Sequence, residues 1–519
     1  MSEKYIIGID QSTQGTKALL FDENGALLRR DDLPHRQIVN EKGWVSHDPE
    51  EIYRNTVQVV RKLVEESGIP KESVQAVGIS NQRETSLVWE KESGKPVADA
   101  VVWQCARAAE ICERIGNGNA ENAGAPETAG DTGASEAAGN TENSGISEMI
   151  REKTGLQLSP YFPAAKLAWI LENIPGAKEK AGEHKLCFGT VDTWLVYKLT
   201  GGKVYKTDYS NASRTQLFNI FELKWDEEIC RLFGIDAGDL AEVCDSDSCF
   251  GETDFDGFFD RPIPIHGVLG DSHGALFGQG CLEPGMIKCT YGTGSSIMMN
   301  IGEQPVLSSH GVVTSLAWGM NGKVNYVLEG NINYTGAVIT WLKVDMELIQ
   351  SPGETEGLCR KAEQDDSLYF VPAFTGLGAP YWDSEAKGAL TGITRTTRKA
   401  EMVRAGVECI AYQITDVIRA MSQDAGTRVQ ELRVDGGPTA NSYLMQFQSD
   451  IADTRVLVPN AQELSGIGAA YAAGLGIGLY DAKVFDGLKR TEYAPCMETE
   501  RRERKYEGWQ QAVETVRTK

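Results

Sequence analysis

The sequence predicts an α/β protein built from two similar domains, and two observations carry that prediction. Apolar segments with strand composition alternate along the chain with segments of helical periodicity. A strand–turn–strand pattern near the N-terminus, YIIGIDQSTQGTKALLFD, returns in the second half as MIKCTYGTGSSIMMN. Like turns in the two halves of a 519-residue chain indicate two related domains, which this length allows.

The first of these patterns reads most simply as a β-hairpin. Residues 5–9 and 17–21 have strand composition, and Gly15 supplies the turn. The alternative is a phosphate cradle, because exposed N–H groups and hydroxyls in a tight turn bind an anion. The Asp10 carboxylate beside the turn suits a Mg²⁺ ion held through water.

Two helices are marked by their end signals. The segment HDPEEIYRNTVQVVRKLVEESGIP predicts a helix with Asp48 as N-cap, Pro49 at its first position and Gly68 near its end. Near the C-terminus, the glycine turn in LRVDGGPTANS joins a strand to a helix, a geometry that favours an anion or a nucleotide. That helix carries an apolar stripe made of Tyr443, Leu444, Phe447 and Ile451.

The segment 116–145 differs from the rest of the chain. It has five acidic residues, no Lys or Arg, and no apolar side chain larger than Ala. Because it cannot bury enough surface to order itself, we expect a disordered surface insertion. It lies between a helix in CARAAEICERI and another that starts near Ile146. A partner-binding loop is the alternative interpretation.

Composition excludes several classes of function. The net charge of −23 argues against nucleic acid or an anionic membrane surface as partner. No apolar run is long enough to span a membrane, and no signal peptide precedes the first strand, so we expect a cytoplasmic protein. The 11 cysteines include no Cys-x-x-Cys pair, which argues against zinc and fits a reducing compartment.

Common nucleotide-binding motifs are absent. The chain has no G-x-x-x-x-G-K-[ST], no G-x-G-x-x-G and no protein-kinase signature set. The duplicated hairpin instead indicates the actin-like ATPase architecture.

From VGISNQRETSLVWEKESGKPV onward, the chain resembles the FGGY carbohydrate kinases, and among them the glycerol kinase pattern. The similarity continues through SPYFPAAKLAWILEN, TDYSNASRTQLFNI, LGDSHGALFGQ, YFVPAFTGLGAPYWD and LRVDGGPTANSYLMQFQSDI, and it omits only 116–145. The resemblance implies two ribonuclease-H-like domains around a catalytic cleft. Residues 1–277 would carry the acceptor pocket and the first phosphate hairpin, and 278–519 would bind the nucleotide. The implied reaction is ATP-dependent phosphorylation of glycerol to glycerol 3-phosphate, with Mg²⁺.

The same resemblance implies a role for each matching residue. Asp271 would be the catalytic base, and Asp10 would position the magnesium through water. The implied acceptor residues are Arg83, Glu84, Trp103, Tyr161, Asp271 and Ser272. The implied nucleotide and phosphate residues are Ser12, Thr13, Lys17, Thr293, Gly336, Gly437 and Asn441.

The residue types also fit a polyol on chemical grounds alone. A polyol offers hydroxyl groups and short C–H stretches. Arg83 is a fork of donors, Glu84 is an acceptor, and a Trp ring covers carbon. A carboxylate such as Asp271 can accept the proton of the attacking hydroxyl.

Four positions depart from the glycerol kinase pattern. Ser272 replaces a Gln and Ser296 replaces a Phe of the pocket wall, while Lys17 replaces an Arg and Thr340 a Gln on the nucleotide side. The first two leave a larger polyol or ketose of the erythritol, threitol, xylulose or ribulose type as an alternative acceptor. An actin-like ATPase without a small acceptor is the remote alternative. The expected partner is a small-molecule polyol, and a homo-oligomer is left open.

Overall fold

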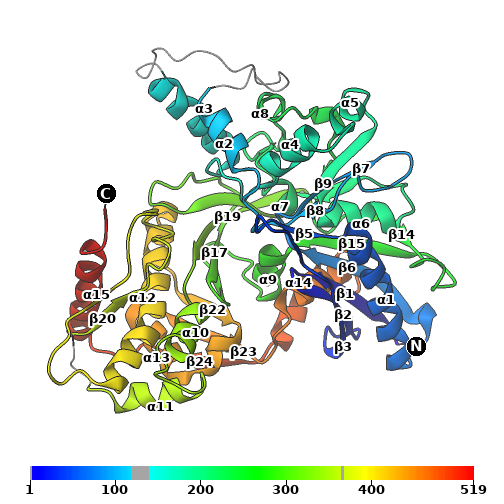
Figure 1. Ribbon diagram of the computed structural model, residues 1–519. Coiled ribbons are helices and arrows are strands. Elements are labelled where there is room, and N and C mark those ends of the chain that lie inside the picture. The colour runs from blue at the N-terminus through cyan, green and yellow to red at the C-terminus, as the bar shows by residue number, and fades with distance from the viewer. Residues whose placement is uncertain (1–2, 119–138, 364–366, 519) are drawn as a thin grey trace. The chain divides into compact units, whose positions relative to one another are not determined.

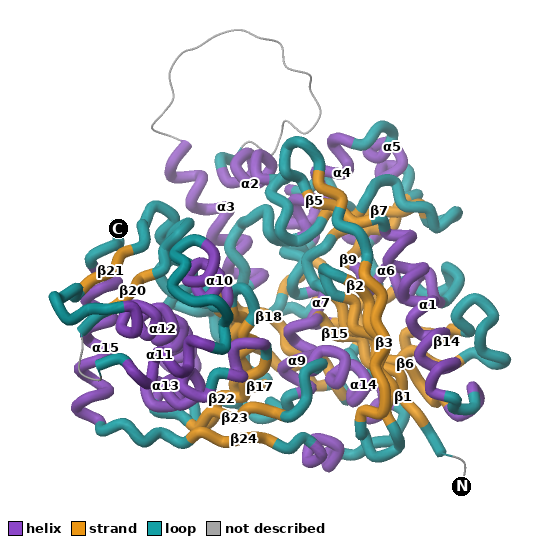
Figure 2. Tube along the Cα trace, turned by 60° about the horizontal axis from the view of Figure 1, so that its bottom comes forward, coloured by secondary structure: helices purple, strands orange, loops and turns teal. Residues whose placement is uncertain are grey.

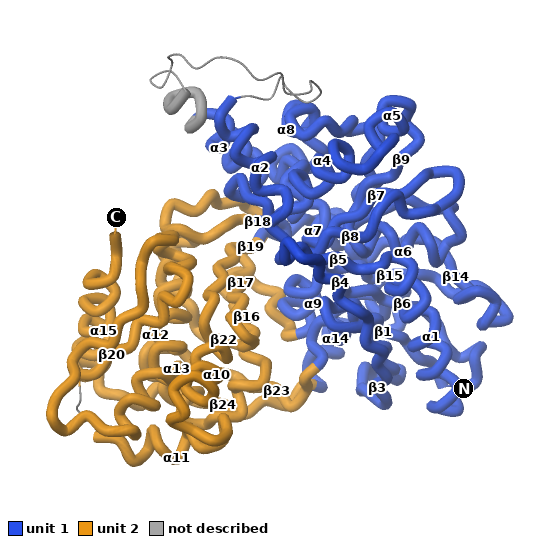
Figure 3. Tube along the Cα trace, in the orientation of Figure 1, with its two compact units in different colours: residues 1–278, 315–326, 463–487 blue, residues 279–314, 327–462, 488–519 orange. Residues whose placement is uncertain are grey.

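The computed structural model describes residues 3–118, 139–363 and 367–518 (Figures 1 and 2). The chain divides into two units, which Figure 3 colours separately. Unit 1 comprises Met1–Gly278, Ser315–Tyr326 and Glu463–Gly487, and unit 2 comprises Gln279–Thr314, Val327–Gln462 and Leu488–Lys519. The chain therefore returns to unit 1 twice after first leaving it.

The main sheet of unit 1 has six strands in the order β14-β15-β6-β1-β2-β3. The strands are β1 (Tyr5–Gln11), β2 (Gly15–Phe21), β3 (Leu27–Pro34), β6 (Val74–Asn81), β14 (Cys249–Thr253) and β15 (Ile263–Gly270). The central strands β1, β6 and β15 are parallel, and β1–β2–β3 is antiparallel. The predicted opening hairpin is thus confirmed.

Side chains alternate across this sheet and separate its two faces. Ile7 and Ile9 join a core with α1 (Pro49–Ser67) and α6 (Val191–Leu199). On the other face, α14 (Leu464–Gly476) approaches so closely that a Cβ at Gly8 would lie 2.5 Å from the Gly466 carbonyl oxygen. Backbone contact of this kind requires glycine.

Unit 1 also contains a second, five-stranded sheet in the order β4-β5-β8-β7-β9. Its strands are β4 (Ile38–Val39), β5 (Val45–His47), β7 (Ser86–Glu90), β8 (Ala100–Val101) and β9 (Leu186–Thr190). The remaining α-helices of the unit are α2 (Ala109–Gly116), α3 (Gly139–Thr154), α4 (Pro163–Asn173), α5 (Ala177–Gly182), α7 (Tyr209–Ala212), α8 (Glu227–Leu232) and α9 (Asp271–Gly278). Its short strands are β10 (Lys206–Asp208), β11 (Phe218–Asn219), β12 (Lys224–Trp225) and β13 (Glu242–Cys244).

Unit 2 repeats the hairpin design in a seven-stranded sheet, β18-β19-β17-β16-β22-β23-β24, of which Ser315–Tyr326, in β18 and β19, is counted with unit 1. The strands are β16 (Ile287–Tyr291), β17 (Ser295–Gly302), β18 (Val313–Met320), β19 (Lys323–Ile332), β22 (Glu431–Asp435), β23 (Arg455–Pro459) and β24 (Arg490–Tyr493). The hairpin β16–β17 is antiparallel and β16 is parallel to β22, as β1 is to β6. The helices are α10 (Gly336–Val344), α11 (Glu354–Lys361), α12 (Lys399–Ala425), α13 (Ser442–Ala452) and α15 (Thr499–Glu514), and β20 (Tyr369–Val371) pairs with β21 (Ala389–Thr391).

The end signals of α1 act as predicted. The Asp48 side chain accepts a hydrogen bond from the Glu50 N–H, and Gly68 ends the helix in the left-handed region with φ 70°. Around the acidic segment the boundaries differ from those expected. α2 begins only at Ala109, and the described part of α3 already includes Gly139, ahead of the expected start near Ile146. Most of the predicted insertion 116–145 lies outside the described residues.

Among the described residues, no helix combines the length and apolarity that crossing a membrane requires.

Candidate active site

The carboxyl ends of three parallel strands bring the predicted residues of unit 1 to one edge of the sheet. Asp10 lies opposite Ser80 in the register of β1 and β6, and Gly270 lies opposite Asn81 in that of β15 and β6. Arg83 and Glu84 follow β6 closely, and Asp271 directly follows β15. This edge is where open α/β sheets bind ligands.

Arg83 is the centre of a charged cluster at that edge. Its Nε lies 3.1 Å from an oxygen of Asp271 and 3.7 Å from Glu84 Oε1. The Arg83 and Glu84 side chains are buried, whereas the Asp271 side chain is 38% exposed. Asp271 is thus the member of this group that solvent or a ligand can reach most readily.

Two aromatic side chains stand together in the same unit. The rings of Trp103 and Tyr161 pack edge to face, with centroids 5.8 Å apart. The Trp103 indole also donates a 2.9 Å hydrogen bond to Thr13 Oγ1, which joins a predicted acceptor residue to the first hairpin turn. A ring of this kind can cover the carbon chain of a small ligand.

Ser272 lies at the start of α9, and its backbone N–H donates a 2.6 Å hydrogen bond to the Asp271 carboxylate. A carboxylate in the first turn of a helix is stabilised by the unpaired N–H groups there. Ser296 lies in unit 2, on β17, where its hydroxyl accepts a 3.3 Å hydrogen bond from buried Lys288.

The first hairpin turn is held by its own hydrogen bonds. The Ser12 N–H and hydroxyl both donate to the Gly15 carbonyl, at 2.9 and 3.0 Å. Lys17 pairs with Asp10 at 3.4 Å and with Glu463 at 2.8 Å. Burial raises the pKa of Asp10 to about 6, because desolvation together with the carboxylates of Asp271 and Glu463 outweighs the ammonium of Lys17.

The second hairpin turn lies beside the start of α10 in unit 2. The Thr293 carbonyl accepts from the N–H groups of Thr335 and Ala337, and the Gly292 carbonyl accepts from the Gly336 N–H. A Cβ at Gly336 would stand 2.8 Å from the Gly292 carbonyl oxygen. Glycine is therefore required for this close approach.

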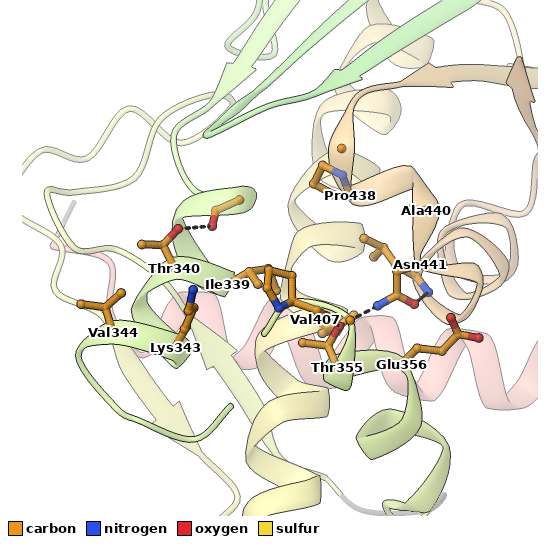
Figure 4. A pocket seen from close by; sticks show the side chains of 15 residues that line it. Ile339, Thr340, Lys343, Val344, Thr355, Glu356, Val407, Pro438, Ala440 and Asn441 are labelled. Atoms are coloured by element: carbon orange, nitrogen blue, oxygen red, sulfur yellow. Dashed lines mark hydrogen bonds between the residues drawn. The ribbon is translucent and has the colours of Figure 1, made fainter. Parts of the chain in front are cut away.

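A pocket of about 570 Å³ opens next to this turn (Figure 4). Predicted residues Gly336, Gly437 and Asn441 all line it. Asn441 also caps α13 by accepting the Leu444 N–H, and it donates to Thr355. The remaining walls are mostly apolar and come from α10 to α13 and from the loops before α11 and α13, with Ile339, Val344, Pro352, Val407, Pro438 and Leu444 among them. A flat apolar ring with polar edges fits such walls.

Sequence reasoning missed three residues that contact the predicted ones. Glu463 pairs with Lys17, while Lys166 and Arg214 contact Glu84. The available signal for Lys166 was a lysine within the apolar run PAAKLAWIL. Glu463 carried no local signal, because it lies 446 residues from Lys17 in the chain.

Family profiles and similar proteins identify the family of this chain. The profile of the N-terminal domain of the FGGY family of carbohydrate kinases matches residues 5–130 and 127–278, and that of the C-terminal domain matches 287–477. Glycerol kinase 1 of Thermotoga maritima is 47% identical over 517 residues, which cover 99% of this chain and all of that protein. A glycerol kinase of Carboxydothermus hydrogenoformans is 45% identical, over 100% of this chain and 99% of the relative.

Solved structures agree with these relatives. A crystal structure of Plasmodium falciparum glycerol kinase with ADP has a TM-score of 0.88 and 33% identity, and the match covers 99% of this chain and 98% of that one. A xylulose kinase from Lactobacillus acidophilus shares the fold, with a TM-score of 0.84 at 20% identity over 99% and 97% of the two chains.

Proposed function

This chain belongs to the FGGY family of carbohydrate kinases, and we propose that it transfers the terminal phosphoryl group of ATP to glycerol. The observation that carries the proposal is the cluster of Arg83, Glu84 and Asp271 at the carboxyl ends of three parallel strands. Relatives named glycerol kinase, 44–47% identical over nearly the whole chain, support glycerol as the acceptor.

The acceptor would be held by complementary hydrogen bonds and by apolar cover. Arg83 donates to hydroxyl oxygens, and Glu84 accepts from hydroxyl hydrogens. Trp103 and Tyr161 cover the short carbon chain. Because most of the catalytic gain in phosphoryl transfer comes from positioning, this fixed cage is the main contribution of unit 1.

Asp271 is the proposed base. Its carboxylate takes the proton of the attacking hydroxyl as that oxygen bonds to phosphorus and the bond from phosphorus to the leaving oxygen breaks. The hydrogen bond from the Ser272 N–H and the guanidinium of Arg83 hold the carboxylate in place. Its partial exposure suits a group that must reach a bound ligand.

The remaining residues would hold the nucleotide and its metal. Gly336, Gly437 and Asn441 shape a pocket whose apolar walls suit a purine base. ATP supplies the phosphoryl group, and Mg²⁺ neutralises charge on its phosphates. Mg²⁺ is commonly bound by one or two carboxylates plus substrate phosphates, and the buried carboxylate of Asp10 beside the Ser12–Thr13 turn fits that requirement. Among the described residues no group of three or more His, Cys, Asp or Glu side chains could hold a metal by itself.

A longer acceptor is the second candidate. Ser272 is shorter than the glutamine of the glycerol kinase pattern, so space beside Asp271 could hold a further CHOH group. The cytoplasm is the proposed compartment, because the substrates of this reaction are found there.

A panel of acceptors tests the proposal. ATP consumption would be measured with glycerol, erythritol, threitol, xylitol, xylulose and ribulose, with excess Mg²⁺. We expect kcat/KM to be highest for glycerol. A tenfold preference for a longer acceptor would replace glycerol, and ATP turnover that no polyol stimulates would reject a polyol kinase altogether.

A further inference from the structure

Two buried cations stand behind the acceptor residues of unit 1. Lys166 lies on α4 with its side chain fully buried, and Arg214 follows α7 and is 1% exposed. Neither side chain is open to solvent, and both contact Glu84. Burying a charge is costly, which raises the question of what these two cations do.

Lys166 ties together two segments that are far apart in the chain. Its ammonium donates to the Glu84 carbonyl at 3.0 Å and to the Tyr161 carbonyl. Glu84 comes from the loop after β6, and Tyr161 precedes α4. A single side chain therefore fixes the backbone of both segments.

Arg214 bridges the same two segments by other atoms. Its Nε lies 2.9 Å from Glu84 Oε1, and its guanidinium carbon lies 5.1 Å from the centroid of the Phe162 ring. Lys166 thus holds the Glu84 backbone while Arg214 holds the Glu84 carboxylate. Both reach across to Tyr161 or its neighbour.

We propose that Lys166 and Arg214 are positioning residues that set the spacing between Glu84 and Tyr161, and so determine which length of acceptor the pocket selects. The proposal rests on the function proposed above. Glu84 accepts a hydrogen bond from a hydroxyl of the acceptor, while the aromatic rings cover the carbon chain that carries this hydroxyl. The distance between Glu84 and the rings therefore decides which chain length places a hydroxyl at Glu84. If the spacing between them relaxes, acceptors of other lengths fit equally well and glycerol loses its advantage.

The surroundings of Lys166 agree with a fixed connector. Burial lowers the pKa of Lys166 to about 7, against the attraction of the Glu84 carboxylate. A neutral amine still has two N–H groups, which is the number that two carbonyls require. The connector therefore keeps both hydrogen bonds in either protonation state.

The alternative is that the two cations only stabilise the fold. Substitution would then lower the melting temperature and reduce activity with every acceptor by the same factor. A positioning role instead changes the ratio of kcat/KM between acceptors and leaves nucleotide binding intact. The ratio is thus the readout that separates the two roles.

The experiment compares the full-length parent with Lys166→Met, Arg214→Met and the double variant. Lys198→Met is the control for the loss of a paired cation in unit 1: Lys198 is half-buried and pairs with Glu50, away from the site residues. For each protein, kcat and KM are measured with glycerol and with erythritol, the ADP Kd by calorimetry, and Tm by scanning. Lys166→Gln, which keeps a donor, and Arg214→Lys, which keeps the charge, serve where a methionine variant does not fold.

We expect each methionine variant to raise the glycerol KM by about tenfold and to reduce the preference for glycerol over erythritol by about fivefold or more. The ADP Kd should stay within about twofold of the parent value. Lys166→Gln and Arg214→Lys should keep part of the preference for glycerol that the methionine variants lose. Because both residues act on Glu84, the double variant should lose less of the preference for glycerol over erythritol than the two single variants lose in combination.

An unchanged glycerol-to-erythritol ratio in both single variants overturns the proposal, whatever happens to Tm. If the parent prefers another polyol, the proposed acceptor is wrong. The ratio of kcat/KM is then compared between that polyol and the polyol that is one carbon shorter. The two failures are distinguishable, because one appears in the parent and the other only in the variants.

Discussion

Replacing Asp271 with Asn tests the proposed chemistry most directly. The change keeps the shape of the side chain and one acceptor oxygen, but it removes the charge and the basicity. A positioned base contributes about 10²–10⁴ in rate, which corresponds to roughly 2.7–5.4 kcal/mol of barrier. We therefore expect kcat with glycerol to fall by that factor while the ADP Kd is unchanged.

The structure predicts only a small effect of Asp271→Asn on folding. Asp271 is 38% exposed, so solvent screens part of its ion pair with Arg83. In this variant Arg83 still has the carboxylate of Glu84 as a partner, with Oε1 3.7 Å from its Nε. The assay is coupled detection of ADP, with Asp260→Asn, a change at an exposed aspartate, as the control. Turnover within about tenfold of the parent would show that Asp271 is not the base.

Three further predictions follow from single positions. Gly336→Ala should raise the ATP KM and leave the glycerol KM unchanged, because the new Cβ would lie 2.8 Å from the Gly292 carbonyl oxygen. Steady-state kinetics measure both constants, and an unchanged ATP KM would contradict this prediction. Gly357→Ala, at an exposed helical position with open space around the new Cβ, should stabilise the protein by about 0.4–1 kcal/mol in urea denaturation, and a loss of stability would be the opposite result. For Lys166, the folded state releases a proton near pH 7 whereas the unfolded lysine keeps it to about 10.5. The unfolded state thus binds more protons across that window, so stability relative to Lys166→Met should rise with pH by up to about 1.4 kcal/mol per unit from pH 7 to 9, and a flat difference would refute the pKa.

Structural elements that depend only on residues close together in the chain can be predicted from the sequence. The cap at Asp48, the turn at Gly68 and both glycine hairpins need only neighbouring residues, and the structure contains all of them. The division at 277/278 and the roles of the site residues stay predictions.

Contacts between distant segments could not be predicted in the same way. Lys17 was expected at a phosphate, and the structure shows it paired with Asp10 and Glu463. Nothing near Glu463 in the sequence points to Lys17, and nothing near Arg214 points to Glu84. The Lys17–Glu463 pair depends on how the chain returns to a unit that it has already left, whereas the Arg214–Glu84 pair joins two distant segments of Met1–Gly278. Periodicity and capping encode neither contact.

That return also affects the order in which the protein can be made. The strands β1, β6 and β15 leave the ribosome early, but α14, whose backbone packs against Gly8, Gly78 and Gly267, belongs to Glu463–Gly487. Domains commonly fold as they emerge during synthesis, N-terminal first. Unit 1 cannot do so completely, because its sheet waits for a helix translated after most of unit 2. A nascent chain paused after residue 278 therefore exposes the glycine-lined face of that sheet, and a gene cut at that point encodes an unfinished unit.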